Sequence, residues 1–417
     1  MNLSPIAGMV LPALAVRAIA APKEIPFGRG CNNFGLSEQQ RELQNAARKF
    51  ARAELPDLAR EIERTDEPVP PDMLRQYGAL GFLGVNLPER YGGMGLSHLD
   101  ALLVLEEFAQ ISVAVAFPVF EALTGPVRTI EHFGSDALKA KILPEIIRGE
   151  KIVAVAMSEP EAGTALTDLT TSARQDGDDI VINGRKRWSS GAGHSEYYIT
   201  YCRFDDIPGA KGIGAVLVEK KHTGVSFGKR EELMGFRGIP SADIFLDDVR
   251  VPRGNMIIGA GGFGQLMSAF GLERCGNAAM GLGVAAAALE DALAYTQERE
   301  AFGKPIVDFQ SVQIKLAEMA MKVDAARLLI WRAAANAKDG LPTAYESSLA
   351  KCFSNEIVRE VTQMGVQVMG GYGYSKEYPM EQRLRDGFAW GIAGGTTDVQ
   401  KTNITAAMIG RRFNQRT

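Results

Sequence analysis

The chain has 417 residues, of which 46% are hydrophobic and 23% charged, and its formal net charge is −4. This length exceeds one typical domain, so two or three packed regions are expected, and the composition is that of a soluble globular protein. The slightly acidic balance argues against nucleic-acid binding through a basic face, so we expect no nucleic-acid partner.

The cysteines and histidines give no sign of a metal site. Cys31, Cys202, Cys275 and Cys352 lie far apart without metal-ligand spacing, and the four histidines are equally scattered. We therefore interpret the cysteines as free thiols in a reducing compartment and expect no metal ligands.

Residues 1–35 stand apart from the rest of the chain, and we expect a poorly ordered extension there. The apolar run Ile6–Val16 is too short to span a membrane, and Met1–Pro5 lacks the positive charge that precedes the apolar run of a signal peptide. The sequence therefore predicts no membrane association and a cytoplasmic protein, or a mitochondrial-matrix protein in a eukaryote.

Residues 36–150 are predicted to form an N-terminal helical domain. Ser37 with Gln40 three residues later fits a capping box at the first helix. Apolar residues then recur at helical spacing. The further helices are expected over Leu74–Leu80, His98–Gln110 and Asp136–Ile147.

Residues 151–260 are predicted to form a small antiparallel β domain. Ile152–Ala156 has the composition of a strand. Asp176-Gly177 and Asn183-Gly184 both match the dipeptides of tight hairpin turns, so two hairpins are expected.

Residues 261–417 return to the helical period, beginning with one long segment over Phe263–Arg299. The preceding Gly259–Gly264 run matches the G-x-G-x-x-G pattern, but a dinucleotide site would need a βαβ unit around it. Helices follow instead, so we interpret the glycines as a linker. The order of helices, strands and helices indicates the α+β class.

Glu273 lies on a largely apolar stripe of this long helix. The stripe consists of Leu266, Phe270, Glu273, Asn277, Met280 and Val284. Burial of an unpaired carboxylate would raise its pKa into the range of a general base. If Glu273 instead pairs with a nearby arginine, its role is structural, and the helix pattern alone leaves both interpretations open.

Gly391–Gln400 is predicted to form a loop that ends at a helix N-terminus, with Thr396 or Thr397 as the cap of a helix running through Ala406–Ile409. Free backbone N–H groups at such a terminus suit a phosphate or a thioester oxygen. The alternative is an ordinary capped helix.

From about Leu36 onward the chain resembles the acyl-CoA dehydrogenase flavoproteins. The segments that carry the resemblance, in the family's order, are Met157–Thr164, Ile182–Ser190, Met234–Arg237, Val249–Pro252, Arg299–Pro305 with Gln310, and Gln367–Gly371. It implies an FAD cofactor, an acyl-CoA substrate and an electron-transfer flavoprotein as the electron acceptor. It also implies a homotetramer whose C-terminal domain is a four-helix bundle.

The resemblance implies the cofactor and substrate contacts as well. Ser158 and Ser190 would bond the edge of the flavin ring, and Trp188 would lie against its face. The expected FAD contacts are Met157, Ser158, Gly163, Thr164, Trp188, Ser190, Arg299, Phe302, Gln310, Gln367, Gly371, Thr396 and Asp398. Within this set, the segments from Arg299 to Gln310 and from Gln367 to Gly371 would serve the FAD of a neighbouring subunit, and Thr164 and Arg274 would contact the substrate.

The catalytic base is where this chain departs from many members of the family, which carry a glutamate where Gly394 stands. The isovaleryl-CoA and long-chain branches keep a glutamate at the position that matches Glu273. The resemblance therefore implies that Glu273 removes the α-proton while the β-hydrogen leaves as hydride to the flavin. The N–H of Gly394 would polarise the thioester carbonyl.

Two smaller departures lie near the flavin segment, where Glu161 replaces a usual glycine and Ala165 replaces a usual aspartate. Glu161 either faces solvent or meets an unusual acyl or carrier group.

The alternatives to an acyl-CoA dehydrogenase are a flavin enoyl-CoA reductase, a dehydrogenase for carrier-protein thioesters, and a regulatory flavoprotein without turnover. The candidate base argues against the last of these.

Overall fold

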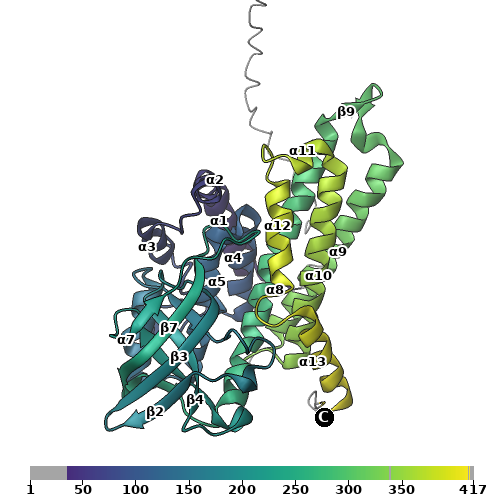
Figure 1. Cartoon of the computed structure of the whole chain (residues 1–417). Helices are drawn as coiled ribbons and strands as arrows, with labels where there is room; N and C mark the ends of the chain where they lie inside the picture. Colours follow the sequence, from purple (N-terminus) through teal and green to yellow (C-terminus); the bar gives the residue numbers. More distant parts are fainter. Residues whose placement is uncertain (1–34, 338–339, 412, 414–417) are drawn as a thin grey trace, which may run out of the picture.

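The computed structural model describes residues 35–337, 340–411 and 413. Figure 1 shows N-terminal helices, a β sheet beside them and a bundle of long C-terminal helices. The predicted α+β fold class, with helices before and after a small sheet, is confirmed. The expected extension, with Cys31, lies outside the described residues apart from Gly35.

The N-terminal region begins with the predicted capping box, in which Ser37 Oγ accepts from the Gln40 N–H and Gln40 bonds back to the Ser37 N–H. Its helices are α1 (Glu38–Glu54), α2 (Pro56–Thr65), α3 (Pro71–Ala79), the short 3₁₀ turn η1 (Glu89–Tyr91), α4 (His98–Ile111), α5 (Val113–Leu123), α6 (Val127–Phe133) and α7 (Asp136–Ile147). Helix α5 was not predicted, because it is apolar on nearly every side and shows no helical period.

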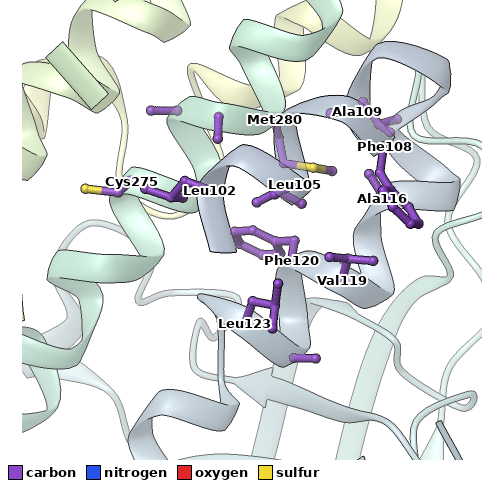
Figure 2. Close-up of a cluster of buried hydrophobic side chains, with 14 of the residues drawn as sticks. Leu102, Leu105, Phe108, Ala109, Ala116, Val119, Phe120, Leu123, Cys275 and Met280 are labelled. Carbon is purple, nitrogen blue, oxygen red and sulfur yellow. The ribbon is translucent and has the colours of Figure 1, made fainter. Parts of the chain in front are cut away.

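Helices α4 and α5 are almost wholly buried against the long helix α8 (Phe263–Glu298). Figure 2 shows Leu105 of α4, Phe120 of α5 and Met280 of α8 in one apolar cluster. A β-carbon on Gly276 of α8 would lie 1.9 Å from Thr124 Oγ1, so this close approach of the end of α5 requires glycine. The contact fixes α5 close to the part of α8 that carries Glu273.

The sheet is mixed, which corrects the expectation of a purely antiparallel domain. Its strands are β1 (Val153–Ala156), β2 (Ser172–Asp176), β3 (Asp179–Ser190), β4 (Tyr197–Phe204), β5 (Ile213–Glu219), β6 (Val225–Phe227), β7 (Ser241–Pro252) and β8 (Met256–Ile258). The order is β6-β7-β3-β2-β4-β5-β8, with β1 paired to β4. Both β1 and β2 run parallel to β4, because connecting segments and intervening strands separate them from β4 in the chain, whereas a tight hairpin would impose antiparallel pairing.

One predicted hairpin turn is confirmed and the other is wrong. Asp176-Gly177 ends β2, and the chain returns antiparallel as β3. Asn183-Gly184 lies inside β3, at a shift of register against β7, so it forms an irregularity within a continuous strand. A β-carbon on Gly184 would lie 2.5 Å from Thr171 Oγ1, which explains the glycine without a turn.

After α8 the chain forms a small hairpin and then the remaining helices. These elements are β9 (Glu300–Ala301), β10 (Lys304–Pro305), α9 (Gln310–Ala335), α10 (Ala344–Met369), α11 (Gly371–Tyr374), α12 (Met380–Trp390) and α13 (Thr397–Ile409). The strand before the Gly259–Gly264 run, β8, pairs antiparallel with β5, and the long helix α8 follows the run. The glycine run is therefore a linker between sheet and helix.

Two helical stretches, Val113–Phe133 and Phe263–Glu298, are long and apolar enough to cross a membrane by length and composition alone. Most of each stretch is buried inside the protein, as in the core helices of soluble proteins.

Candidate active site

The two predicted catalytic positions, Glu273 and Gly394, meet where α8 passes the loop between α12 and α13. A β-carbon placed on Gly394 would lie 3.9 Å from Oε1 of Glu273 and 3.6 Å from Nδ2 of Asn277. Gly394 has φ +63°, in the left-handed region that favours glycine. Residues 121 positions apart in the chain thus form one centre, as the sequence analysis expected.

Glu273 has no hydrogen bond or ion pair with any of the residues that the structure describes. Its burial raises the pKa of the carboxyl to about 7, although the positive charges of Arg274 and Lys351 lower it. Arg274 therefore acts on Glu273 through charge without a direct ion pair. Of the two interpretations left open by the sequence, this environment favours the general base, since a base works best with a pKa near the operating pH.

Lys351 of α10 holds the loop that carries Gly394. Its buried Nζ donates to the carbonyl oxygens of Trp390 at 3.3 Å, Ala393 at 2.8 Å and Gly395 at 2.9 Å. Burial lowers the pKa of Lys351 to about 7. An ammonium group has three donors, and each of them has an acceptor here.

A second α10 side chain, Asn355, joins α8 to the same loop. Its Nδ2 donates to Asn277 Oδ1 at 2.7 Å and to the Trp390 carbonyl at 2.5 Å. Neither Lys351 nor Asn355 was predicted as a site residue. A signal was present, because the buried polar residues of α10 recur at helical spacing among apolar ones; they include Ser347, Ser348, Lys351, Ser354 and Asn355.

The loop ends at the predicted helix cap. Thr396 is the N-cap of α13, and its Oγ1 accepts from the Val399 N–H at 3.4 Å. Thr396 is half-buried and Asp398, in the first turn, is exposed. Within the described part of the chain, the N–H of Gly394 has no acceptor, so it is available to a ligand oxygen.

On the β domain, Trp188 turns its indole outward. The side chain is 54% exposed, the backbone has φ +62°, and the residue lies at a register shift between Lys186 and Ser189. A bulge of this kind redirects a side chain out of the regular alternation. The exposed indole suits the face of a flat aromatic ring, and the half-buried Ser190 follows it directly.

A buried ion pair orders the segment beside Trp188. Lys186 Nζ donates to Glu159 Oε1 at 2.8 Å and to the Met157 carbonyl at 3.1 Å. Burial acts to raise the pKa of Glu159, but Lys186 and the hydrogen bonds from Thr170 and Thr171 hold it at about 2. Met157 is thereby tied to β3.

Ser158 is also tied to β3, since its carbonyl accepts from the Arg187 N–H at 2.9 Å. Gly163 and Thr164 are exposed, and a β-carbon on Gly163 would meet no atom within 4 Å. Glu161 is exposed too, which favours its solvent-facing interpretation. The Lys186–Glu159 ion pair was not predicted, because its partners lie 27 residues apart and nothing in either segment marks them as paired.

The remaining predicted cofactor residues lie at the other end of the molecule. In Figure 1 the β9 hairpin and α11 lie at the far end of the long helices, away from the sheet. The exposed residues there are Arg299, Phe302, Gln310, Gln367 and Gly371. Phe302 is 96% exposed, and the Arg299 guanidinium lies 5.8 Å from the ring centre of Tyr372. Within one chain, the predicted contacts therefore form two separate groups.

Arg274, the other predicted substrate contact, is buried beside Glu273, and its Nε has no hydrogen-bond partner in the described residues. A buried guanidinium normally bonds to acceptors. An acceptor from a bound ligand would satisfy it.

Comparison with known proteins covers almost the whole described chain. The N-terminal, middle and C-terminal domains of acyl-CoA dehydrogenases match residues 37–150, 154–249 and 260–409. The chain is 35% identical over 377 residues to a 3-(aryl)acrylate reductase of Clostridium sporogenes, covering 90% of this chain and 99% of that protein. It is 36% identical over 378 residues to the caffeyl-CoA reductase-Etf complex subunit CarC of Acetobacterium woodii, covering 90% and 99%. The structure of butyryl-CoA dehydrogenase from Megasphaera elsdenii superposes with a TM-score of 0.87 at 33% identity, covering 90% and 100%.

Proposed function

The chain belongs to the acyl-CoA dehydrogenase family of FAD-dependent oxidoreductases, and from this premise we propose that Glu273 is its α-proton base. The observation that carries the proposal is the approach of the Glu273 carboxylate to the place where a side chain on Gly394 would begin, at 3.9 Å. Many other members of the family carry the catalytic glutamate at the position of Gly394. In this chain a glutamate on α8 can reach the same reaction centre.

Each residue at this centre has a separate role in the proposed reaction. Glu273 takes the proton from Cα of the thioester, and the Gly394 N–H donates to the carbonyl oxygen on which negative charge develops. When bound, FAD supplies the acceptor for the hydrogen that leaves Cβ as hydride. The electron pair of the Cα–H bond becomes the new double bond, so the acyl-CoA becomes a trans-2-enoyl-CoA.

The features around Trp188 fit a large flat cofactor. The indole is exposed, Ser158 and Ser190 lie in the segments beside it, and the loop at Gly163 leaves open space. We propose that these residues hold the flavin ring. Exposed Arg299 offers the paired donors that match a pyrophosphate.

Assembly as a homotetramer is part of the proposal. Phe302, at 96% exposure and φ +53°, is a large apolar side chain held in an unfavourable backbone conformation at the tip of a hairpin. A neighbouring subunit and its FAD would cover it together with Gln310 and Gln367. Native mass spectrometry should give a tetramer with FAD near one per chain, and a flavin-loaded monomer would contradict this.

We also propose an electron-transfer flavoprotein as the redox partner, because one relative is named as a subunit of a reductase-Etf complex. Two relatives carry the name reductase, which favours enoyl-CoA reduction as the second candidate function. The same centre serves either direction, since protonated Glu273 can return a proton to Cα. Oxidation of the reduced enzyme by enoyl-CoA, followed by flavin absorbance, compares the two directions.

The test of the base compares wild type, Glu273→Gln and Glu161→Gln by anaerobic rapid mixing with a series of acyl-CoA thioesters. Glu273→Gln keeps the shape of the side chain and loses its basicity, so flavin reduction should slow on the order of 10²–10⁴-fold. The exposed Glu161→Gln control should retain the wild-type rate. A wild-type rate in Glu273→Gln, with FAD bound, would overturn the assignment.

A further inference from the structure

A small cavity lies between α5 and two loops of the β domain, one after β3 and one before β7. Its volume is about 20 Å³, which is room for about one water molecule. The lining residues include Phe117, Pro118, Ile239, Glu121, His194 and Ser195. Most of the lining is apolar, so the few polar groups decide what the cavity accepts.

Two polar side chains at this cavity have no partner in the described part of the chain. Glu121 is 6% exposed, and none of the described residues gives it a hydrogen bond or an ion pair. Ser195 is 0% exposed, and its Oγ likewise has no hydrogen-bond partner. Buried polar groups in folded proteins are nearly always hydrogen-bonded, so two unpartnered groups at one cavity indicate a missing polar partner.

Burial disfavours the charged forms of the titratable groups at this cavity. Burial raises the pKa of Glu121 well above its ordinary value, and the charge of Glu273 raises it further. Burial also lowers the pKa of His194. The lining residues include no lysine or arginine. A neutral group that both donates and accepts suits this set, whereas an acyl carboxylate would find no counter-charge.

The cavity also lies beside the reaction centre. Glu121 is near enough to Glu273 for the two carboxyls to interact through their charges. The preceding residue, Phe120, has its ring centre 6.3 Å from that of Trp390, which is the last residue of α12 before the loop of Gly394. An acyl chain whose Cα lies at Glu273 therefore has the carboxyl of Glu121 within its surroundings.

We propose that Glu121 and Ser195 form a subsite for a hydroxyl group on the acyl chain of the substrate. The inference rests on the proposed function, because it places the thioester at Glu273 and Gly394. The hydroxyl would occupy this cavity and bond to the Glu121 carboxyl and Ser195 Oγ. A methyl group in the cavity would leave Glu121 and Ser195 without hydrogen-bond partners. A thioester that ends in a methyl group should therefore bind less tightly than its hydroxylated counterpart.

The experiment compares terminally hydroxylated acyl-CoA thioesters of increasing length with their unhydroxylated counterparts. For the chain length that reaches the cavity, wild-type kcat/KM should favour the hydroxylated thioester roughly 10- to 100-fold. Glu121→Leu and Ser195→Ala should reduce or reverse this ratio while FAD content stays unchanged. Tyr201→Phe is the matched control, because Tyr201 Oη is also buried without a partner and interacts with Glu273 but does not line the cavity.

The outcomes separate this inference from the proposed function. Equal kcat/KM for both thioester series, or an equal ratio in wild type and Glu121→Leu, would mean that the cavity holds only water and would overturn the subsite. If no thioester reduces the flavin, the proposed function fails. Calorimetric binding of the two series would then still test the subsite without turnover. Glu121→Met, which has a similar length and no strong hydrogen-bonding group, replaces Glu121→Leu if the latter does not fold.

Discussion

The reaction centre and the exposed hairpin end of the C-terminal bundle are built in opposite ways. Around Gly394, Lys351 and Asn355 bond to backbone and side-chain acceptors of the same chain. At the hairpin, Arg299 and Phe302 project outward with few partners of their own. The first region is held in place by contacts within one chain, whereas the second presents exposed side chains with little support from their own chain.

We expect the largest effect from moving the catalytic base of the reaction centre from position 273 to position 394. Glu273→Ala should slow flavin reduction on the order of 10²–10⁴-fold, and adding Gly394→Glu should restore part of the rate. A β-carbon at Gly394 would make only ordinary van der Waals contacts, but the φ of +63° strains any residue other than glycine. A misplaced base should leave the double variant roughly 10²-fold below wild type. Rapid-mixing absorbance across a thioester series measures both, and no gain for any thioester would show that the positions do not share one centre.

Loss of the buried ion pair between Lys186 and Glu159 should lower the free energy of unfolding more than loss of any contact at the β9 hairpin. Lys186→Met leaves the buried Glu159 carboxylate without its partner, so the free energy of unfolding should fall by about 3–5 kcal/mol. Replacing both residues, as Lys186→Met with Glu159→Leu, should cost less than the single change because no charge remains buried. Urea denaturation of the four proteins in this cycle gives the values. Equal losses in the single and double variants would contradict the assigned role of the pair.

The pH profile tests whether the interior charges act as described. Burial raises the pKa of Glu273 to about 7, and only the ionised carboxylate can accept the α-proton. The rate of flavin reduction should therefore fall about tenfold for each pH unit below that pKa. Single-turnover absorbance across this range is the measurement. A rate independent of pH between pH 5 and 8, the range in which a base of this kind titrates, would contradict Glu273 as the base.

At the hairpin the expected effect is smaller and concerns the cofactor. Arg299→Ala should weaken FAD retention by roughly 10-fold, the size of one lost charge-assisted hydrogen bond, with little change in the unfolding transition. Arg60→Ala, which removes an exposed arginine of α2, is the control. Flavin released on gel filtration provides the readout, and equal release from both variants would argue against a contact between Arg299 and FAD.

The fold class, the helix caps and the meeting of Glu273 with Gly394 were predictable because they follow from local patterns or from a strong family resemblance. The polar contacts of Lys351, the Glu159–Lys186 pair and the cavity of Glu121 with Ser195 were not. Each depends on packing between segments distant in the chain, and a single sequence does not show which buried polar groups will face one another. Asn183-Gly184 illustrates the same limit, because one dipeptide fits both a hairpin turn and an irregular strand.

The hydrogen bonds from Lys351 to the loop also affect the amide group that faces the thioester. The Ala393 carbonyl, which accepts from Lys351 Nζ at 2.8 Å, belongs to the same peptide unit as the Gly394 N–H. In a trans peptide these two groups point in opposite directions and share one delocalised π system. A cation at the oxygen draws electron density away from the nitrogen, and hydrogen bonds linked in this way strengthen one another. Burial lowers the pKa of Lys351 to about 7, and in its protonated form the side chain would make the Gly394 N–H a stronger donor. Lys351 would then support, through a single amide plane, the oxyanion that we propose forms at Gly394.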